Sequence, residues 1–220
     1  MRHLEVAAGG RQTAVSGRAA ASLGVEGFGL SRGGTARERN EDSMLVGGGA
    51  GGAHFAVADG MGGHAAGEVA SRIAVEALAT LPAAGSLATA VRMANGRIFE
   101  AQDGKKEGGD LSGMGTTVVA LRFSRTETGL AAEVAHVGDS RAYLFRDGLL
   151  LPLTEDHSFV NALLKGGIID REEASRHPRR NILNRALGTG DARPDLAHFE
   201  ALPGDRVLLC SDGLYEAVSE

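Results

Sequence analysis

Several apolar segments of this 220-residue sequence end on an aspartate, and this pattern constrains the fold more than any other feature. The segment FAVADG carries Asp59, EVAHVGDS carries Asp139 and RVLLCSDG carries Asp212. Each apolar run has the length and composition of a buried β-strand. When neighbouring strands end at one edge of a sheet, their terminal side chains gather there. The sequence therefore predicts a group of carboxylates at the lip of the core.

Such a group needs a positive partner. Burial disfavours a charged carboxylate, and like charges raise each other's pKa. The segment RNED (39–42) supplies two further acids, Glu41 and Asp42. Histidine and cysteine do not cluster near these acids, which argues against zinc. All-oxygen ligation suits a hard divalent cation, so the pattern favours Mg²⁺ or Mn²⁺.

Glycines beside these aspartates admit two interpretations. Gly60 follows Asp59 directly, and a residue without a side chain would leave room for a cation and free its own carbonyl as a ligand. A single Asp-Gly pair is more often a plain turn, and Asp147-Gly148 fits a hairpin turn well. The repetition of the pattern at strand ends, together with RNED, favours the metal interpretation for Asp59.

Composition excludes several other classes of protein. Lys plus Arg number 23 against 28 Asp plus Glu, and without a long basic run this argues against a nucleic-acid partner. Cys210 is the only cysteine, which excludes an intrachain disulfide framework and suits a reducing cytoplasm. No apolar stretch approaches the roughly 18 residues that span a bilayer, and no secretory h-region is visible. We therefore expect a cytoplasmic protein without a membrane segment.

The remaining pattern predicts a mixed fold. Apolar residues recur at spacings of three and four over residues 65–81 and again after Ser86, which suits an N-cap, so two helices are expected. Residues 157–187 are predicted to be helical, and residues 1–24 to form a poorly ordered tail. Strands are predicted at residues 25–30, 43–46, 54–58, 116–123, 131–137, 142–145 and 206–210. Consecutive strands broken by helical pairs are typical of an α+β fold with antiparallel sheets.

These segments closely resemble the PPM family, the 2C-type metal-dependent protein serine/threonine phosphatases, in its bacterial form. The matching segments follow the family order from about residue 25 to residue 220. They are RERNED (37–42), DGMGGHAAGEVAS (59–71), GMGTT (113–117), HVGDSRAYL (136–144), LTEDHSFV (153–160), HPRRNILNRALG (177–188) and LLCSDGL (208–214). Each segment alone is weakly specific, but their shared order argues strongly against chance.

The resemblance implies a four-layer α-β-β-α sandwich of two antiparallel sheets over residues 25–220, with a flap at about 157–187 beside the site. It also implies that this sequence stops before the family's C-terminal helix, closing strand and last metal-ligand aspartate. On that basis we expect an incomplete phosphatase domain with weakened binding of the first metal. We also expect an unpaired sheet edge.

The resemblance further implies a role for each acid. Asp59 would bridge two metal ions, with the Gly60 carbonyl as a further ligand. Glu41 would serve the second metal, and Asp42 would hold metal-bound water. These ions would be Mn²⁺ or Mg²⁺.

Three more residues complete the implied site. Asp212 would ligate the first metal, and Asp139 with Asp212 matches a third, weaker metal site. Arg37 matches the arginine that grips the substrate phosphate, a task that suits the guanidinium fork. The implied catalytic residues are thus Arg37, Asp42 and Asp59.

The implied reaction is hydrolysis of phosphoserine or phosphothreonine by a metal-activated water. The partners would be phosphorylated proteins, including serine/threonine kinases. Met61 stands where eukaryotic relatives place a histidine, so the proton donor stays open between water and His64. A non-catalytic phosphoprotein-binding module (a pseudophosphatase) is the alternative, because the last ligand is absent. A hydrolase of small phosphate esters is a third.

Overall fold

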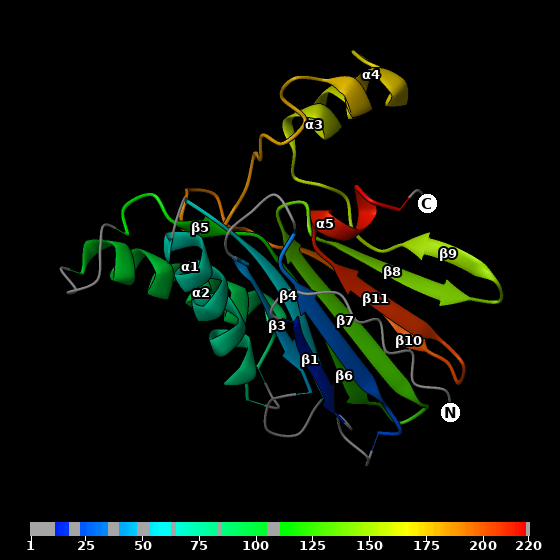
Figure 1. The fold of residues 1–220 in the computed structure, drawn as a ribbon. Coiled ribbons are helices and arrows are strands. Elements are labelled where there is room, and N and C mark those ends of the chain that lie inside the picture. Colours follow the sequence, from blue (N-terminus) through cyan, green and yellow to red (C-terminus); the bar gives the residue numbers. More distant parts are fainter. Residues whose placement is uncertain are drawn as a thin grey trace.

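The computed structural model describes residues 12–17, 23–34, 40–47, 53–62, 65–82, 85–104 and 111–218, the first of these ranges as backbone only (Figure 1). The strands are β1 (Gln12–Gly17), β2 (Gly27–Arg32), β3 (Asp42–Val46), β4 (Ala53–Met61), β5 (Gly115–Thr116), β6 (Val118–Arg125), β7 (Leu130–Val137), β8 (Arg141–Arg146), β9 (Leu149–Pro152), β10 (Asp195–Ala201) and β11 (Arg206–Cys210). The helices are α1 (Ala65–Ala79), α2 (Leu87–Asp103), α3 (Phe159–Lys165), α4 (Arg171–Arg176) and α5 (Asp212–Tyr215).

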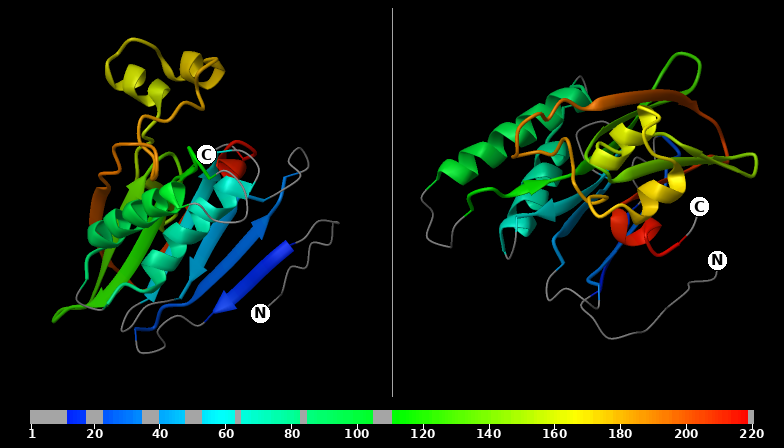
Figure 2. Two further views of the ribbon diagram at one scale, coloured as in Figure 1. Left: turned by 90° about the vertical axis from the view of Figure 1, so that its left-hand side faces the viewer. Right: turned by 90° about the horizontal axis from the view of Figure 1, so that it is seen from above.

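All strand pairs are antiparallel. The larger sheet has the order β10-β7-β6-β4-β3, with β5 pairing the end of β4. A second sheet has the order β11-β8-β9, and β1 pairs with β2. Helices α1 and α2 lie side by side on one face of the larger sheet, whereas α3 and α4 project beyond the strands (Figures 1 and 2). This is the α+β sandwich of antiparallel sheets that the sequence predicted.

Strand alternation divides the core into two layers. On β4, Ala56 and Ala58 are buried against the helices, while Phe55 and Val57 pack toward the second sheet. Small residues on α1, such as Ala70 and Ala74, are fully buried and let that helix approach the sheet closely. Residues of β8 and β11 join the other layer with β6 and β7. The larger sheet is thus covered on both faces.

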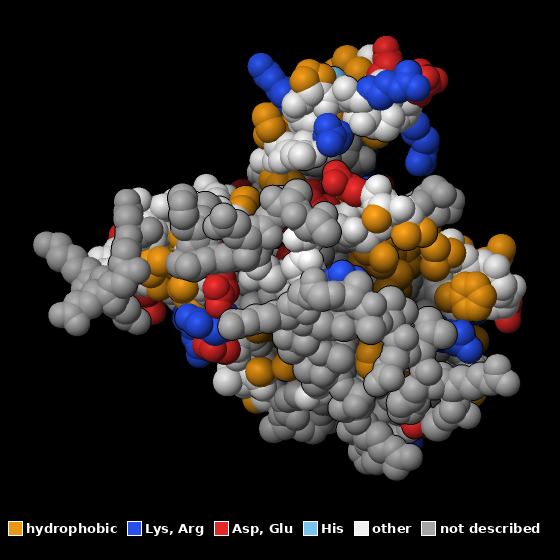
Figure 3. All heavy atoms as spheres, in the orientation of Figure 1, with side chains coloured by type: hydrophobic (Ala, Val, Ile, Leu, Met, Phe, Trp, Pro, Cys, Tyr) orange, Lys and Arg blue, Asp and Glu red, His pale blue; other side chains and the backbone are white. Residues whose placement is uncertain are grey.

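The second sheet is covered less completely. Within the described ranges, no long helix lies over its outer face, and Phe145, Leu150 and Leu208 are 41%, 47% and 43% exposed. Hydrophobic side chains gather visibly near β8 and β9 (Figure 3). Among the described strands β11 pairs only with β8 and so forms one edge of the second sheet.

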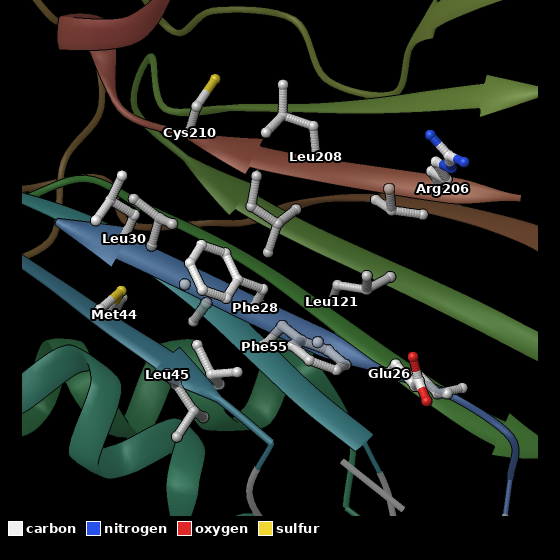
Figure 4. Close-up of a pocket in the computed structure, with 18 of the residues that line it drawn as sticks. Glu26, Phe28, Leu30, Met44, Leu45, Phe55, Leu121, Arg206, Leu208 and Cys210 are labelled. Atoms are coloured by element: carbon white, nitrogen blue, oxygen red, sulfur yellow. The ribbon is translucent and has the colours of Figure 1, made fainter. Parts of the chain in front are cut away.

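A cavity of about 1520 Å³ lies between β2 and β11. Phe28 and Leu30 of β2, Phe55 of β4 and Leu121 of β6 are among the residues that line it (Figure 4). Its lining also includes Asp42, Asp59 and Asp212. The cavity therefore joins an apolar wall to part of the acidic cluster.

The flap corrects one prediction. Only α3 and α4 are helical within residues 157–187, so the expected continuous helical segment is wrong. Gly166 ends α3, and Asp170 starts α4 through a capping box with Glu173. His177 ends α4 in an extended conformation, as the following Pro178 requires.

Three strands were not predicted. β1 lies inside the tail expected to be poorly ordered over residues 1–24, yet it pairs with β2 over Gln12–Gly17. β9 follows the predicted Asp147-Gly148 hairpin, and β10 forms an edge of the larger sheet. β1 and β10 have no long apolar run, so tertiary pairing decides their conformation, whereas β9 is an apolar segment, Leu149–Pro152, that the sequence could have indicated.

Candidate metal centre

Strand register brings Asp42 and Asp59 together. β3 begins at Asp42, and β4 runs antiparallel to it, so that Asp42 and Asp59 are direct cross-strand partners. The backbone N–H of Gly60 then donates to the Glu41 carbonyl at 3.2 Å, which continues this pairing for one residue. The segment RNED is thus fixed against the end of FAVADG by ordinary sheet geometry.

The second sheet brings Asp139 and Asp212 to the same end. Arg141 at the start of β8 pairs with Cys210 at the end of β11. Asp139 precedes Arg141 by two residues and Asp212 follows Cys210 by two, so both acids leave the ladder at one edge. The Ser211 hydroxyl donates to Asp42 Oδ2 at 2.9 Å, which links the two sheets at this point. Four predicted acids therefore converge on one end of the sandwich.

Thr117 holds the backbone of this cluster. Its N–H donates to the Asp59 carbonyl at 2.9 Å, and its hydroxyl accepts from the Asp59 N–H at 3.0 Å. The same hydroxyl lies 2.7 Å from the Ser140 hydroxyl, beside Asp139. Sequence reasoning gave neither Thr117 nor Ser211 a role, although GMGTT and LLCSDGL were the signals that contain them.

The acids perturb one another strongly. Burial, followed by the charges of Asp42 and Asp212, raises the pKa of Asp59 to about 8. A hydrogen bond shared with Asp212 and the charge of Asp139 act in the same direction. Burial, followed by the charges of Asp156 and Asp212, raises the pKa of Asp139 to about 6. Without a cation, Asp59 is therefore mostly protonated at neutral pH.

The donor set fits a hard divalent cation by its chemistry. All four acids offer oxygen, and a cation would relieve the repulsion that holds Asp59 protonated. As the side chains stand, the described residues include no group of three or more His, Cys, Asp or Glu arranged to hold a metal ion. Asp59 and Asp212 instead share a side-chain hydrogen bond.

The glycine after Asp59 has a more specific cause than room for a cation. A Cβ on Gly60 would lie 2.1 Å from the Gly67 carbonyl oxygen, at the start of α1, and 2.7 Å from the Glu41 carbonyl oxygen. Gly60 and Gly67 thus let α1 contact the end of β4 directly. Gly213 after Asp212 has open space around it. The interpretation that these glycines make room for a cation stays a prediction.

Two predicted residues cannot be placed. Arg37, expected to grip the phosphate, and His64, a candidate proton donor, lie outside the described residues. Cys210 is buried at the end of β11, as a structural thiol would be. The positions of Glu41, Asp42, Asp59, Gly60, Asp139 and Asp212 agree with one site, while their roles as ligands stay a prediction.

Known proteins share this arrangement of elements. The family described as protein phosphatase 2C matches residues 34–220. Serine/threonine protein phosphatase PstP of Mycobacterium tuberculosis is 46% identical over 194 residues, which are 85% of this chain and 36% of PstP. Serine/threonine phosphatase stp of Listeria welshimeri is 43% identical over 173 residues, 74% of this chain and 67% of the relative.

Solved structures agree with the sequence comparison. The catalytic domain of serine threonine protein phosphatase PstP, in complex with two manganese ions, has a TM-score of 0.70 at 39% identity. That match covers 96% of this chain and 80% of the solved chain. The chain belongs to the protein phosphatase 2C family. It spans about a third of the M. tuberculosis relative, 36% of its length.

Proposed function

We propose that this chain is a metal-dependent protein serine/threonine phosphatase. The observation that carries the proposal is the convergence of Asp42, Asp59, Asp139 and Asp212, which raises the pKa of Asp59 to about 8. A chain gains nothing in stability from burying acids that repel one another, so a ligand of opposite charge is the physical reason to keep them together. The named relatives are serine/threonine phosphatases, which supports the reaction class.

The cation would be Mn²⁺ or Mg²⁺, two ions and a third more weakly held. Two manganese ions in the solved PstP domain support manganese. Asp59 would bridge two ions with the Gly60 carbonyl beside it, Glu41 would serve the second and Asp212 the first. Asp139 with Asp212 would form the third site. A bound divalent cation supplies two things here, a lowered pKa of water and neutralisation of phosphate charge.

The chain's own residues would then orient the reactants. The Ser211 hydroxyl donates to Asp42 Oδ2 at 2.9 Å and so fixes this carboxylate. Asp42 would accept a further hydrogen bond from the water that attacks the phosphate. Arg37 would bind the substrate phosphate through its guanidinium fork. Thr117 would keep the Asp59 backbone in register with Ser140, so that both sheets present their acids together.

Substrates would be phosphorylated proteins, with serine/threonine kinases among them. None of the helices in the described ranges has the length and apolar character needed to cross a membrane. The single buried thiol of Cys210 suits a reducing compartment such as the cytoplasm, which we propose as the location.

Hydrolysis of a phosphothreonine peptide tests this function. Turnover should require Mn²⁺, stop with chelator and fall by about 10² or more in Asp59→Ala, because a bridging ligand is removed. The matched control is Asp147→Asn, which changes an exposed turn carboxyl with φ of 52° at the far end of β8. A folded chain that binds the phosphopeptide without turning it over would instead favour the pseudophosphatase alternative.

A further inference from the structure

Arg141 lies where three segments around the acidic cluster meet. It is the first residue of β8 and follows Asp139 by two positions. Its Nε and Nη2 atoms donate to the two carboxylate oxygens of Asp156 at 2.9 and 2.8 Å, a bidentate fork. Its guanidinium carbon lies 3.7 Å from the ring centroid of Tyr215. This cation–π contact, together with the fork, joins three parts of the chain that are far apart in sequence.

The contact with Tyr215 reaches the element that carries Asp212. α5 is a single turn, Asp212–Tyr215, in which the Glu216 N–H donates to the Asp212 carbonyl at 2.9 Å. One turn of helix has little stability of its own, so side-chain contacts must fix its position. Burial and then the charge of Asp139 raise the pKa of the Tyr215 phenol, which places the ring beside the same acids.

The other partner of Arg141, Asp156, lies directly before the flap, which begins at about residue 157. The Asp156 carbonyl accepts a hydrogen bond from Asn161 Nδ2 of α3 at 2.7 Å. Beside it, the His157 N–H donates to the Gly138 carbonyl at 2.9 Å, next to Asp139. The Arg141 guanidinium therefore contacts both Asp156, directly before the flap, and Tyr215 of α5. Figure 1 shows α5 at the end of β11.

We propose that Arg141 is a positioning residue of the acidic cluster. By stacking on Tyr215 it holds α5, and with it Asp212, facing Asp139, and so sets the affinity of the site for a divalent cation. The inference rests on the proposed metal-dependent function. Lysine would replace this side chain only in part, because an ammonium group keeps an attraction to the ring but has neither the planar fork nor the flat face that stacks on it.

Two measurements on the full chain test the proposal. Free Mn²⁺ is titrated by electron paramagnetic resonance, and hydrogen exchange of the Glu216 and Val218 amides is followed in the metal-free protein. The variants are Arg141→Lys, Tyr215→Leu, which removes the ring, and Tyr215→Phe, which keeps it. The control is Arg146→Lys. Arg146 lies on the same strand and forks onto Asp205 at 2.8 and 2.6 Å, at the end of β8 away from Asp139.

Arg141→Lys and Tyr215→Leu should each speed exchange of both amides and weaken Mn²⁺ binding by about tenfold or more, as removal of an outer-shell partner does. Tyr215→Phe and Arg146→Lys should leave both readouts within about twofold of the wild type. Unchanged exchange in a folded Tyr215→Leu protein would overturn the proposal. Faster exchange with unchanged Mn²⁺ affinity would overturn it as well.

The wild-type chain separates this inference from the proposed function. If it binds no Mn²⁺, the proposed function fails, and the link from Arg141 to metal affinity fails with it. If it binds Mn²⁺ and shows no turnover, the proposed reaction fails while the Mn²⁺ titration still decides the role of Arg141.

Discussion

The central strands β4, β6 and β7 carry two clusters of buried ionisable groups, one toward each end. At one end, His54, Arg122 and Glu133 are successive cross-strand neighbours. Arg122 Nη2 lies 2.7 Å from Glu133 Oε2, and Arg122 Nη1 donates to the Gly85 carbonyl. At the other end, Asp59 and Asp139 meet acids from β3 and α5, and burial followed by the charges of neighbouring acids raises the pKa of both.

The difference separates a structural cluster from a functional one. Arg122 and Glu133 neutralise each other within the chain, and burial followed by the charge of Arg122 lowers the pKa of His54, which therefore stays neutral. At the other end, burial raises the pKa of Asp59 first, and the neighbouring charges with the largest effect on it are those of other acids, Asp42 and Asp212. A group of acids that repel one another is what a cation site offers.

The largest expected effect is at the self-neutralising end. Glu133→Gln leaves the Arg122 guanidinium buried beside a neutral group, and removing one partner of such a pair costs about 3–5 kcal/mol of unfolding free energy. Urea unfolding measures the loss, and Mn²⁺ affinity should stay unchanged. Glu172→Gln, which breaks the exposed pair with Arg176, is the control and should cost far less. An equal loss in both variants would contradict the buried pair.

In the absence of metal, the acidic cluster around Asp59 should make the free energy of unfolding depend on pH. The pKa of Asp59 is raised from 3.8 to about 8, so the native state binds the proton more tightly than the unfolded state. The contribution of Asp59 to stability is therefore full below about pH 4 and falls by up to about 1.4 kcal/mol per pH unit until about pH 8. Urea unfolding across this range measures the slope.

Three buried histidines change stability with pH in the direction opposite to Asp59, and the same experiment can separate the two effects. The pKa values of His54, His136 and His157 are all lowered, with burial as the first cause, so their contribution is lost as pH falls below about 6.5. In Asp59→Asn the fall toward pH 8 should shrink while the loss on the acid side remains. A variant with the same slope as the wild type above pH 6.5 would rule out Asp59 as its source.

A smaller effect concerns the glycines at the acidic end. A Cβ on Gly67 would lie 2.9 Å from the backbone of Gly60 and Met61, so Gly67→Ala should push α1 away and cost about 1–3 kcal/mol. Gly96→Ala in α2 is the control. It meets nothing within 4 Å and should stabilise the protein by about 0.5–1 kcal/mol. Thermal unfolding of both variants checks the opposite signs.

Much of the fold could be predicted because local signals agreed with the tertiary structure. Ser86 caps α2 by accepting a hydrogen bond from the Thr89 N–H, and the periodic residues Leu87, Val91 and Ile98 are buried, as expected. The flap could not be predicted from its polar, helix-forming composition, because its turns at Gly166 and Pro178 interrupt it. β10 was missed because it has no continuous apolar run, and its strand conformation depends on pairing with β7.

The candidate site, like the fold, could be predicted from the sequence only in part. Strand ends on aspartate were sufficient to predict that Asp59, Asp139 and Asp212 gather, but register brings acids together only within each sheet, Asp42 with Asp59 and Asp139 with Asp212. The hydrogen bond from Ser211 to Asp42 joins residues 169 positions apart, and no local pattern announces it. The contact between Gly60 and Gly67 depends likewise on how α1 meets the sheet. Sequence thus supplied the acids, and packing between elements supplied what holds them.

The most direct test of the central claim is thermal unfolding of the wild type and Asp59→Asn, each with and without Mn²⁺. The account predicts that Asp59→Asn is at least as stable as the wild type at pH 8 without metal, because a repelled carboxyl is gone. Mn²⁺ at a hundred times its dissociation constant should stabilise the wild type by about 2.7 kcal/mol and the variant far less. A destabilised metal-free variant, or equal stabilisation of both proteins by Mn²⁺, would contradict the claim that these acids form a cation site.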